Sequence, residues 1–365
     1  MRVVLYAFDH IEYTIQLAEA LSKLQDVMLM LPESKERWFR EVLERNLTLE
    51  PYYQPRLRYP TNLLALYKIV KKINKFSPDI VHLQGEHPWF NLVLPFLTRK
   101  YPLVVTVHDV VLHVGDVVSR KIPPLVYGLS VRYADEIIVH GEKLRKEIIE
   151  KSHKSAEKVH VVPRGVNSIY LRFRNSSIEE ENESVLFFGR IYEYKGLRYL
   201  IEAQPLITEK VPKAKIIIAG RGEDLGKYLK MMAHREKFII HNRAIPGRMV
   251  AELFQRASVV VLPYIEASQS GIVPLAYAFK KPVVVTNVGS IPEVVDDGKT
   301  GYIVPPKDPE KLAEAIIDLL INREKRREMG ENAYRKTEKE LSWDNIAVKT
   351  IEVYKKALAN RCKSA

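Results

Sequence analysis

The sequence predicts an α/β protein with two successive doubly wound domains. Short apolar runs alternate with helical patterns almost from end to end, which is typical of parallel sheets covered by helices. The chain has 365 residues, which is longer than a single hydrophobic core usually supports, so two domains are expected. The alternation restarts after residues 175–184, a polar, acidic stretch without apolar periodicity that we interpret as a linker.

Each half of the chain has its own series of strands and helices. In the first half we expect strands near residues 2–8, 27–31, 80–84, 103–107, 136–140 and 158–162, with helices such as 13–23 and 61–76. In the second half we expect strands at 185–188, 215–219, 237–240, 258–262, 282–286 and 302–304, and helices at 196–208, 247–256, 270–279 and 308–321. The predicted domains are therefore 1–174 and 185–341.

The last segment, residues 342–365, is predicted to form a separate helix. Apolar residues recur at helical spacing from Trp343 to Tyr354, and Ser342 is suited to cap the first turn. This apolar stripe must be buried, so we expect the helix to pack against another element and to be able to cross back to the first domain.

Composition places the chain among ordinary globular proteins, with 46% hydrophobic and 28% charged residues. No apolar run approaches the roughly 18 residues that span a bilayer. The first apolar run, residues 3–8, ends in Asp9 and His10 without a small-residue cleavage site, which favours a strand over a signal peptide. The single cysteine, Cys362, excludes an internal disulfide framework and fits a reducing cytoplasm.

The excess of 57 basic over 45 acidic residues, a net charge of +12, favours anionic partners. No recognised nucleic-acid module is present, so nucleic acid is not predicted as a partner. Residues 52–76 combine six basic side chains with several aromatic ones and no acidic one. This segment can lie on an anionic lipid surface, and the protein would then associate peripherally with the inner membrane face. The alternative is an ordinary amphipathic surface helix.

The most informative motif, FGRIYEYKG, runs from Phe188 to Gly196 directly after a predicted strand. It places Arg190 and Lys195 beside a glycine turn, at the carboxyl end of that strand, where open α/β sheets bind ligands. Two fixed cations beside glycine backbone suit a diphosphate. The alternative is a surface turn with two solvated basic residues.

Two further turns follow predicted strands of the second half. Residues 220–223, GRGE, form a glycine turn where the backbone can approach a flat ligand, or a plain turn. Residues 261–273 pass through a Ser/Gln/Gly loop into a helix at Ser270 and Gly271, whose free N–H groups favour an anion. Glu266 can accept hydrogen bonds from sugar hydroxyls, or it can be a solvated residue beside a capped helix. The turns within 282–301 are interpreted as scaffold.

This ordered set resembles glycosyltransferase family 4, the retaining, nucleotide-sugar-dependent enzymes of the GT-B fold. The likeness is strongest over residues 158–325, from the VVPRGVN stretch at 161–167 through the FGR and KG motifs to residues 282–312. It implies two Rossmann-like domains facing across a cleft, and transfer of a hexose from a UDP- or GDP-type sugar with retention. Because the chain lacks an Asp-x-Asp signature, we expect no obligatory metal and no cofactor beyond the nucleotide-sugar co-substrate.

The resemblance also implies roles for individual residues. Arg190 and Lys195 match the pair that grips the diphosphate, and the base would rest near Arg221, Gly222 and Ile245. The catalytic candidates are Arg190, Lys195 and His108. The donor-binding candidates are Gly189, Arg221, Gly222, Ile245, Glu266, Gln269, Ser270, Gly271 and Ile272.

The sequence departs from the family pattern in the second half. The family carries two glutamates eight positions apart around the helix entry. Glu266 matches the first only approximately, and the second position falls on Pro274 or Leu275, neither of which can bind ribose as a carboxylate does. Residues 268–271, SQSG, look like a recurrent variant of the family. The departure leaves the donor and its ribose contact open.

The first half is less typical of the family. A glycine-rich loop is usual after the first strand, but Asp9 and His10 stand here; they can contact an acceptor or cap the strand end. Gln84 occupies the place of a histidine that the family has two positions after His82. Strand-end histidines can serve instead, although many such residues are structural. The acceptor-side candidates are Asp9, His10, His87 and Asp109, beside the catalytic candidate His108.

The predicted function is therefore sugar transfer to a hydroxyl acceptor in glycan biosynthesis. Glycans, lipid-linked acceptors and small molecules all remain open as acceptors. Two alternatives are a GT-B sugar phosphorylase, which would release sugar onto inorganic phosphate, and a non-catalytic nucleotide-sugar-binding protein.

Overall fold

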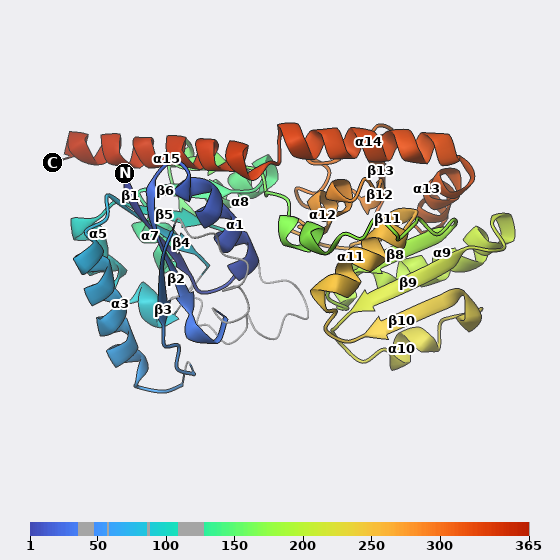
Figure 1. The fold of residues 1–365 in the computed structure, drawn as a ribbon, viewed down its shortest axis with the longest axis horizontal. Coiled ribbons are helices and arrows are strands. Elements are labelled where there is room, and N and C mark those ends of the chain that lie inside the picture. The colour runs from blue at the N-terminus through green and yellow to red at the C-terminus, as the bar shows by residue number, and fades with distance from the viewer. Residues whose placement is uncertain (36–46, 57, 86–87, 109–127, 365) are drawn as a thin grey trace. The chain divides into compact units, whose positions relative to one another are not determined.

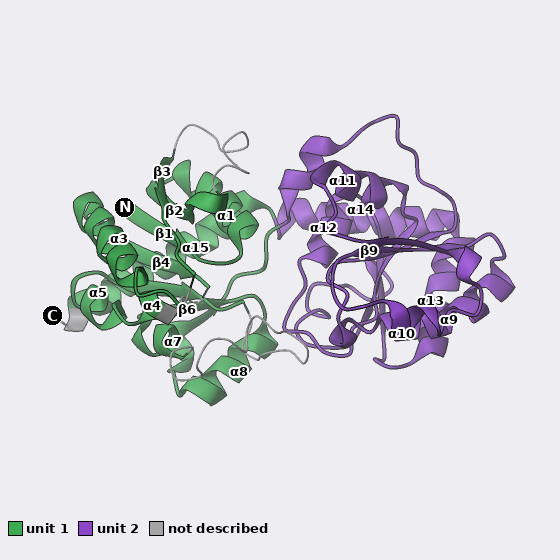
Figure 2. Cartoon of the chain, turned by 90° about the horizontal axis from the view of Figure 1, so that it is seen from below, with its two compact units in different colours: residues 1–110, 117–165, 342–365 green, residues 111–116, 166–341 purple. Residues whose placement is uncertain are grey.

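The computed structural model describes residues 1–35, 47–56, 58–85, 88–108 and 128–364 (Figure 1). Their contacts divide the chain into two compact units (Figure 2). Unit 1 comprises the described residues up to Gly165 together with those from Ser342 onward, and unit 2 comprises Val166–Leu341. The predicted fold class is confirmed, because each unit has a sheet of parallel strands with helices on its faces.

The described part of unit 1 forms a seven-stranded sheet in the order β3-β2-β1-β4-β5-β6-β7. Its strands are β1 (Arg2–Ala7), β2 (Asp26–Pro32), β3 (Thr48–Tyr52), β4 (Ile80–Gln84), β5 (Leu103–Thr106), β6 (Glu136–Val139) and β7 (Val159–Val161). Its helices are α1 (Ile11–Ser22), α3 (Asn62–Phe76), α4 (Pro88–Asn91), α5 (Leu94–Lys100), α7 (Leu129–Tyr133), α8 (Glu142–Ser152) and α15 (Trp343–Ser364), with a 3-10 turn, η2 (Ala156–Lys158).

Unit 2 forms a six-stranded sheet in the order β10-β9-β8-β11-β12-β13. Its strands are β8 (Ser184–Phe188), β9 (Lys215–Gly220), β10 (Phe238–Asn242), β11 (Val259–Leu262), β12 (Val283–Thr286) and β13 (Gly301–Val304). Its helices are α9 (Leu197–Lys210), α10 (Gly226–Leu229), α11 (Gly247–Arg256), α12 (Ile272–Ala278), α13 (Pro309–Ile321) and α14 (Arg323–Lys339). Its 3-10 turns are η3 (Ser168–Phe173), η4 (Glu193–Lys195) and η5 (Arg235–Lys237).

Both faces of each sheet are buried, which explains why the strands are almost continuously apolar. Along β1, Val3 and Leu5 pack with α1 and α15, whereas Val4 and Tyr6 pack on the other face with helices from α3 to α8. The strands of unit 2 divide in the same way, between α11 and α12 on one face and α9 and α13 on the other. This alternation is the period of two expected for strands.

The C-terminal helix α15 is part of unit 1. The indole Nε1 of Trp343 donates to Gln16 Oε1 at 3.1 Å, and Asn360 Nδ2 donates to Glu136 Oε1 at 2.8 Å. Its apolar stripe, which includes Ile346 and Tyr354, is buried against α1 and the sheet. In the described part of the chain, no helix has the length and apolarity needed to span a bilayer.

The boundary between the units differs from the sequence-based one. Contacts divide the chain after Gly165, whereas the sequence predicted a first domain that extends to residue 174 and a linker over 175–184. Residues 175–184 belong to unit 2, because Glu181 exchanges hydrogen bonds with Arg256, its carbonyl accepts from the Ser258 hydroxyl, and Glu180 pairs with two buried cations. These are polar interactions, so the segment shows no apolar periodicity.

Strand β3 and helix α14 are among the elements that were not identified from the sequence. Strand β3 lies at the edge of its sheet, has a partner on one side only and contains Pro51, as edge strands tolerate. Helix α14 is mostly charged, and its buried residues include Arg326 and Gly330, so its apolar stripe is sparse.

Candidate functional site

The predicted donor-binding residues gather at the carboxyl edge of the unit 2 sheet. Because β8, β9, β11 and β12 are parallel neighbours, the loops that follow them emerge at the same edge. These loops contain residues 189–196, 221–225, 263–271 and 287–290. The sheet topology thus brings together motifs that are separated by up to about a hundred residues in the sequence.

Arg190 and Lys195 converge on two tyrosines. Arg190 Nη2 donates to Tyr194 Oη at 3.1 Å, and Lys195 Nζ lies 3.7 Å from the centre of the Tyr264 ring and 4.9 Å from that of Tyr194. Arg190 is exposed, Lys195 is half-buried, and both tyrosines are buried. Burial raises the pKa of Tyr264, while Arg190 opposes the rise, so this phenol is neutral. We call these four residues the cation–tyrosine cluster.

Gly196 fixes the position of the cluster. Its φ is +65°, in the left-handed region that favours glycine, and it precedes the first residue of α9. A Cβ atom at this position would overlap the carbonyl oxygen of Pro263. The backbone N–H of Ile265 also donates to the carbonyl of Tyr194 at 2.8 Å. The turn after β8 is therefore held directly against the chain that leaves β11.

The turns after β8 and β9 are joined by their backbones. Gly189 N–H donates to the carbonyl of Ala219 at 3.0 Å, and Ile191 N–H donates to that of Arg221 at 3.1 Å. A Cβ on Gly222 would overlap the carbonyl oxygen of Ile191. The structure thus places three predicted donor-binding residues, Gly189, Arg221 and Gly222, beside Arg190. Another donor-binding candidate, Ile245, follows β10 and is half-buried against the apolar core.

The loop before α12 carries the other donor-binding candidates. Ser270 Oγ accepts the N–H of Ile272 at 3.2 Å and lies 3.5 Å from Tyr264 Oη, which links this loop to the cation–tyrosine cluster. The side-chain oxygen of Gln269 is buried and has no hydrogen-bond partner among the described residues. A buried acceptor without a partner, such as the Gln269 oxygen among the described residues, is uncommon in a folded protein and points to a ligand. The backbone N–H of Glu266, in the same loop, lies 3.4 Å from the Tyr194 carbonyl.

The loop after β12 lies against the same segment, although its sequence was interpreted as scaffold. Ser290 N–H donates to the Ser268 carbonyl at 2.9 Å, and a Cβ on Gly289 would overlap the carbonyl oxygen of Ala267. The hydroxyl of Ser290 is buried and has no partner within the described residues. Gly289 and Ser290 thus extend the site beyond the predicted residues.

A second group of candidates lies at the carboxyl edge of the unit 1 sheet. The rings of His10 and His108 stack with their centres 3.7 Å apart. His140 Nε2 lies 3.0 Å from His108 Nδ1, and Arg164 Nη1 lies 3.4 Å from the same atom. Asp9 is exposed and accepts the N–H of His10 at 2.7 Å. We call His10, His108, His140 and Arg164 the histidine cluster.

The histidine cluster continues into a buried polar network. His108 Nε2 lies 2.9 Å from Gln84 Oε1, and Gln84 Nε2 lies 3.0 Å from His82 Nε2. His82 Nδ1 lies 2.7 Å from the hydroxyl of Tyr354 in the C-terminal helix. Gln84, which stands where the family has a histidine, therefore orients His108.

Burial determines the charge of these histidines. It lowers the pKa of His108 well below its ordinary value, and the neighbouring His10, His140 and Arg164 lower the pKa further. Burial likewise lowers the pKa of His82 to about 3. Both rings are neutral near pH 7, so His108 acts through hydrogen bonds and carries no charge.

Two further points concern the predicted site residues His87 and Asp109 and the prediction that no metal is required. His87 and Asp109 lie outside the described residues. Where the structure describes the chain, no three His, Cys, Asp or Glu side chains are grouped so as to hold a metal ion.

Four side chains of the two clusters were not predicted from the sequence: Tyr194, Tyr264, His140 and Arg164. All four follow strands of the two sheets, so the strand-end argument could have identified them. Their pairing could not be read from the sequence, because the partners are far apart along the chain.

Comparisons with known proteins match both units. Residues 171–336 match the family Glycosyl transferases group 1, and residues 12–168 match Glycosyltransferase Family 4. An uncharacterized glycosyltransferase of Methanocaldococcus jannaschii is 32% identical over 256 residues, which are 66% of this chain and 64% of that protein. The sulfoquinovosyl transferase of Arabidopsis thaliana is 27% identical over 313 residues, 79% of this chain and 58% of that protein. The chain thus spans less than two thirds of the length of either relative.

Solved structures share the fold at low sequence identity. A glycosyltransferase from Rickettsia africae has a TM-score of 0.74 and 18% identity, with 98% of this chain and 99% of that chain covered. The Anabaena protein Alr3699/HepE in complex with UDP has a TM-score of 0.72 and 18% identity, with 97% and 100% covered. The family matches over both units, together with this shared architecture, show that the chain belongs to glycosyltransferase family 4 and has the GT-B fold.

Proposed function

We propose that the protein transfers a hexose from a nucleoside diphosphate sugar to a hydroxyl acceptor, with retention of anomeric configuration and without an obligatory metal ion. The observation that carries this proposal is the convergence of Arg190 and Lys195 on Tyr194 and Tyr264 at the carboxyl edge of the unit 2 sheet. Complexes of the related fold of Anabaena HepE with UDP and with UDP-glucose support a nucleotide-sugar donor.

Arg190 and Lys195 stabilise the negative charge that develops on the departing diphosphate. The tyrosines hold both cations in place before the reaction, which is the condition for strong electrostatic catalysis. The hydroxyl and backbone N–H groups at Ser270 and Gly271 add positive potential from the start of α12. The nucleotide base rests near Arg221, Gly222 and Ile245.

Gln269 takes over a hydrogen bond that the second glutamate of the family pattern would make. The alternative positions, Pro274 and Leu275, are both buried and apolar, so neither side chain can bind a hydroxyl. The unpartnered side-chain oxygen of Gln269 can accept a hydrogen bond from a sugar or ribose hydroxyl. The hydroxyl of Ser290, also unpartnered in the described chain, is a second candidate for this contact.

In the described part of unit 1, Asp9 and His10 are the candidates for contact with the acceptor, and the neutral His108 is the catalytic candidate beside them. A neutral imidazole can donate one hydrogen bond and accept another, which suits the orientation of an acceptor or donor-sugar hydroxyl. Gln84 and His140 hold the His108 ring in one orientation. Glycans, lipid-linked acceptors and small molecules all offer a suitable hydroxyl.

The test begins with a thermal-shift screen of nucleoside diphosphate sugars, since a bound donor raises the apparent stability by mass action. Transfer from the identified donor is then measured in the wild type, Arg190→Ala and Arg198→Ala. Loss of one positioned donor group costs on the order of 100- to 1,000-fold in rate, so Arg190→Ala should lose transfer. Arg198 is exposed and paired with Glu202 on α9, so its replacement should leave transfer intact.

Near-wild-type turnover in Arg190→Ala would exclude the proposed role. Sugar release onto inorganic phosphate would identify a phosphorylase instead. Donor binding without hydrolysis or transfer would identify a non-catalytic nucleotide-sugar-binding protein.

We further propose that α3 and α5 rest on an anionic membrane surface. Leu63, Tyr67 and Phe96 are 58%, 65% and 68% exposed, respectively, and the two helices line a mainly apolar cavity of about 420 Å³. The segment 52–76 adds basic side chains and no acidic one, which complements anionic lipid.

Vesicle sedimentation tests this surface. The protein should sediment with anionic vesicles and not with zwitterionic ones, and Tyr67→Glu should reduce sedimentation. The matched control is Val348→Glu, which replaces an exposed apolar residue of α15. Equal loss of binding in both variants would contradict the assignment of the surface.

A further inference from the structure

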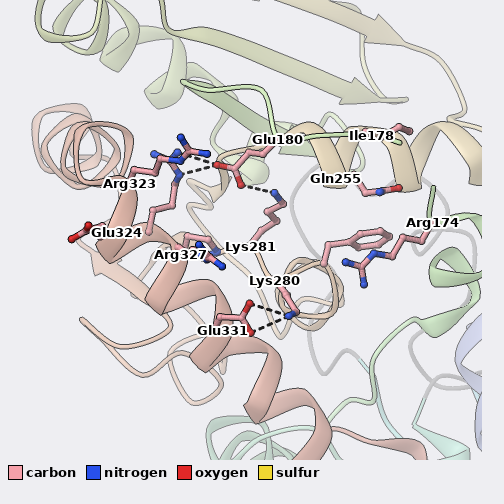
Figure 3. Close-up of a pocket in the computed structure, with 13 residues that line it drawn as sticks. Arg174, Ile178, Glu180, Gln255, Lys280, Lys281, Arg323, Glu324, Arg327 and Glu331 are labelled. Carbon is pink, nitrogen blue, oxygen red and sulfur yellow. Dashed lines mark hydrogen bonds and ion pairs between the residues drawn. The ribbon is translucent and has the colours of Figure 1, made fainter. Parts of the chain in front are cut away.

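Unit 2 contains a cavity of about 420 Å³ at the edge of its sheet opposite the proposed donor site (Figure 3). It is lined by residues 279–282, which connect α12 to β12, by the first turns of α14 and by residues 174–180. Helix α12 begins two residues after Ser270 and ends at this cavity, and β12 begins at the cavity and leads into the loop that contains Ser290. The cavity is therefore separate from the cation–tyrosine cluster.

The lining of the cavity carries an excess of positive charge. Its three carboxylates, Glu180, Glu324 and Glu331, are outnumbered two to one by cations. The six cations are Arg174, Lys280, Lys281, Arg323, Arg326 and Arg327.

Two of the carboxylates are already engaged. Glu180 binds Lys281 Nζ at 2.7 Å and Arg326 at 3.0 Å, and these two cations are only 6% and 3% exposed. Arg326 also donates to the Leu319 carbonyl at 2.8 Å. These contacts attach the chain around residue 180 to α14, so Lys281 and Arg326 have a structural role.

The second pair joins Lys280 to Glu331 at 2.9 Å. In Figure 3 the third carboxylate, Glu324, points away from both pairs. Within the described chain, no ion pair joins any of the three carboxylates to Arg174, Arg323 or Arg327.

Three arginines are left. Within the described chain, the guanidinium groups of Arg174, Arg323 and Arg327 take part in no hydrogen bond or ion pair, and Figure 3 shows Arg174 and Arg327 on opposite sides of Lys281. Burial lowers the pKa of Lys281, the pairing with Glu180 opposes this change, and the charges of Arg326 and Arg174 lower the pKa further. The cavity thus keeps a positive potential after its internal pairs are formed.

We propose that this cavity binds a small phosphorylated molecule through a phosphoryl or pyrophosphoryl group held by Arg174, Arg323 and Arg327. Guanidinium groups match phosphate oxygens in bidentate geometry, and several of them around one cavity suit a multiply charged anion. The volume lies within the range of small-molecule sites, and the lining residues Phe279 and Ile178 offer apolar contact to the rest of the ligand.

The site is tested by calorimetric titration of pyrophosphate at constant ionic strength. Because the proposed donor site can also bind pyrophosphate, all titrations use an Arg190→Ala background. The cavity should still bind pyrophosphate in this background, and a further Arg327→Gln or Arg174→Gln change should weaken binding by about tenfold, as expected for the loss of one charge-assisted contact.

Arg335→Gln provides the matched control, because Arg335 is exposed on the same helix, α14, and does not line the cavity. It should leave the affinity unchanged. All these arginines are exposed, so folding should be retained, and a thermal melt of each variant checks this. Absence of binding in the Arg190→Ala background would overturn the proposal. Equal weakening by Arg327→Gln and Arg335→Gln would also overturn it, since it would show attraction to the general positive charge.

Discussion

Replacement of Gly196 by alanine tests the geometry on which the cation–tyrosine cluster depends. The residue has a φ of +65°, and an added Cβ would overlap the carbonyl oxygen of Pro263. The left-handed conformation costs a non-glycine residue about 1–2 kcal/mol. Relief of the overlap by a backbone shift adds about 1–3 kcal/mol, the usual cost of overpacking. We therefore expect Gly196→Ala to lower the free energy of unfolding by about 2–5 kcal/mol.

Gly298 offers a matched control in the same unit. Its φ is +72°, but nothing lies within 4 Å of an added Cβ. Gly298→Ala should therefore show only the conformational cost, about 1–2 kcal/mol. The difference between the two variants isolates the contact with Pro263. Of the two variants, only Gly196→Ala should also lose sugar transfer, because the backbone shift displaces Lys195 together with the turn.

Urea unfolding distinguishes the units by two signals. The three tryptophans, Trp38, Trp89 and Trp343, all lie outside residues 166–341, so tryptophan fluorescence follows unit 1 and circular dichroism follows both units. The reasoning is refuted if Gly196→Ala destabilises the protein no more than Gly298→Ala does.

Two further predictions concern buried charge. Glu180→Gln should lower the free energy of unfolding by about 3 kcal/mol, because Lys281 and Arg326 lose their carboxylate. This is the lower end of the cost of a broken buried ion pair, since Glu180 itself is one-third exposed. A urea midpoint equal to that of the wild type would contradict this prediction. His82, with a pKa lowered to about 3, binds a proton only when the protein unfolds, so the free energy of unfolding should fall by about 1.4 kcal/mol per pH unit as pH decreases from about 6.5 towards 3. His82→Gln should reduce this slope in fluorescence-monitored urea titrations, and an unchanged slope would assign the proton uptake to other groups.

The fold could be predicted because its signals are local. Runs such as residues 3–7 and 283–286 are buried on both faces of their sheets, so they form continuous apolar stretches in the sequence. Strand β3 lacks this signal, because it is paired on one side only and its residues are mostly half-buried. The segment 175–184 was assigned to a linker because the hydrogen bonds and ion pairs that attach it to unit 2 leave no apolar periodicity in the sequence.

The donor-binding candidates could be predicted for a topological reason. In a parallel sheet all carboxyl ends share an edge, so a motif that follows one strand must lie near the motifs that follow its neighbours. The positions of Arg190, Gly222 and Ser270 follow from this rule and from the order of the strands.

The sequence by itself determined the fold class, the family resemblance and the edge of the sheet at which the charged motifs lie. The tertiary structure alone decided which side chains meet. His82 reaches Tyr354 across 272 positions, Glu180 reaches Arg326 across 146, and His108 reaches His140 across 32. No local sequence pattern predicts such pairs, because each pair depends on how strands and helices from distant parts of the chain are arranged within one unit.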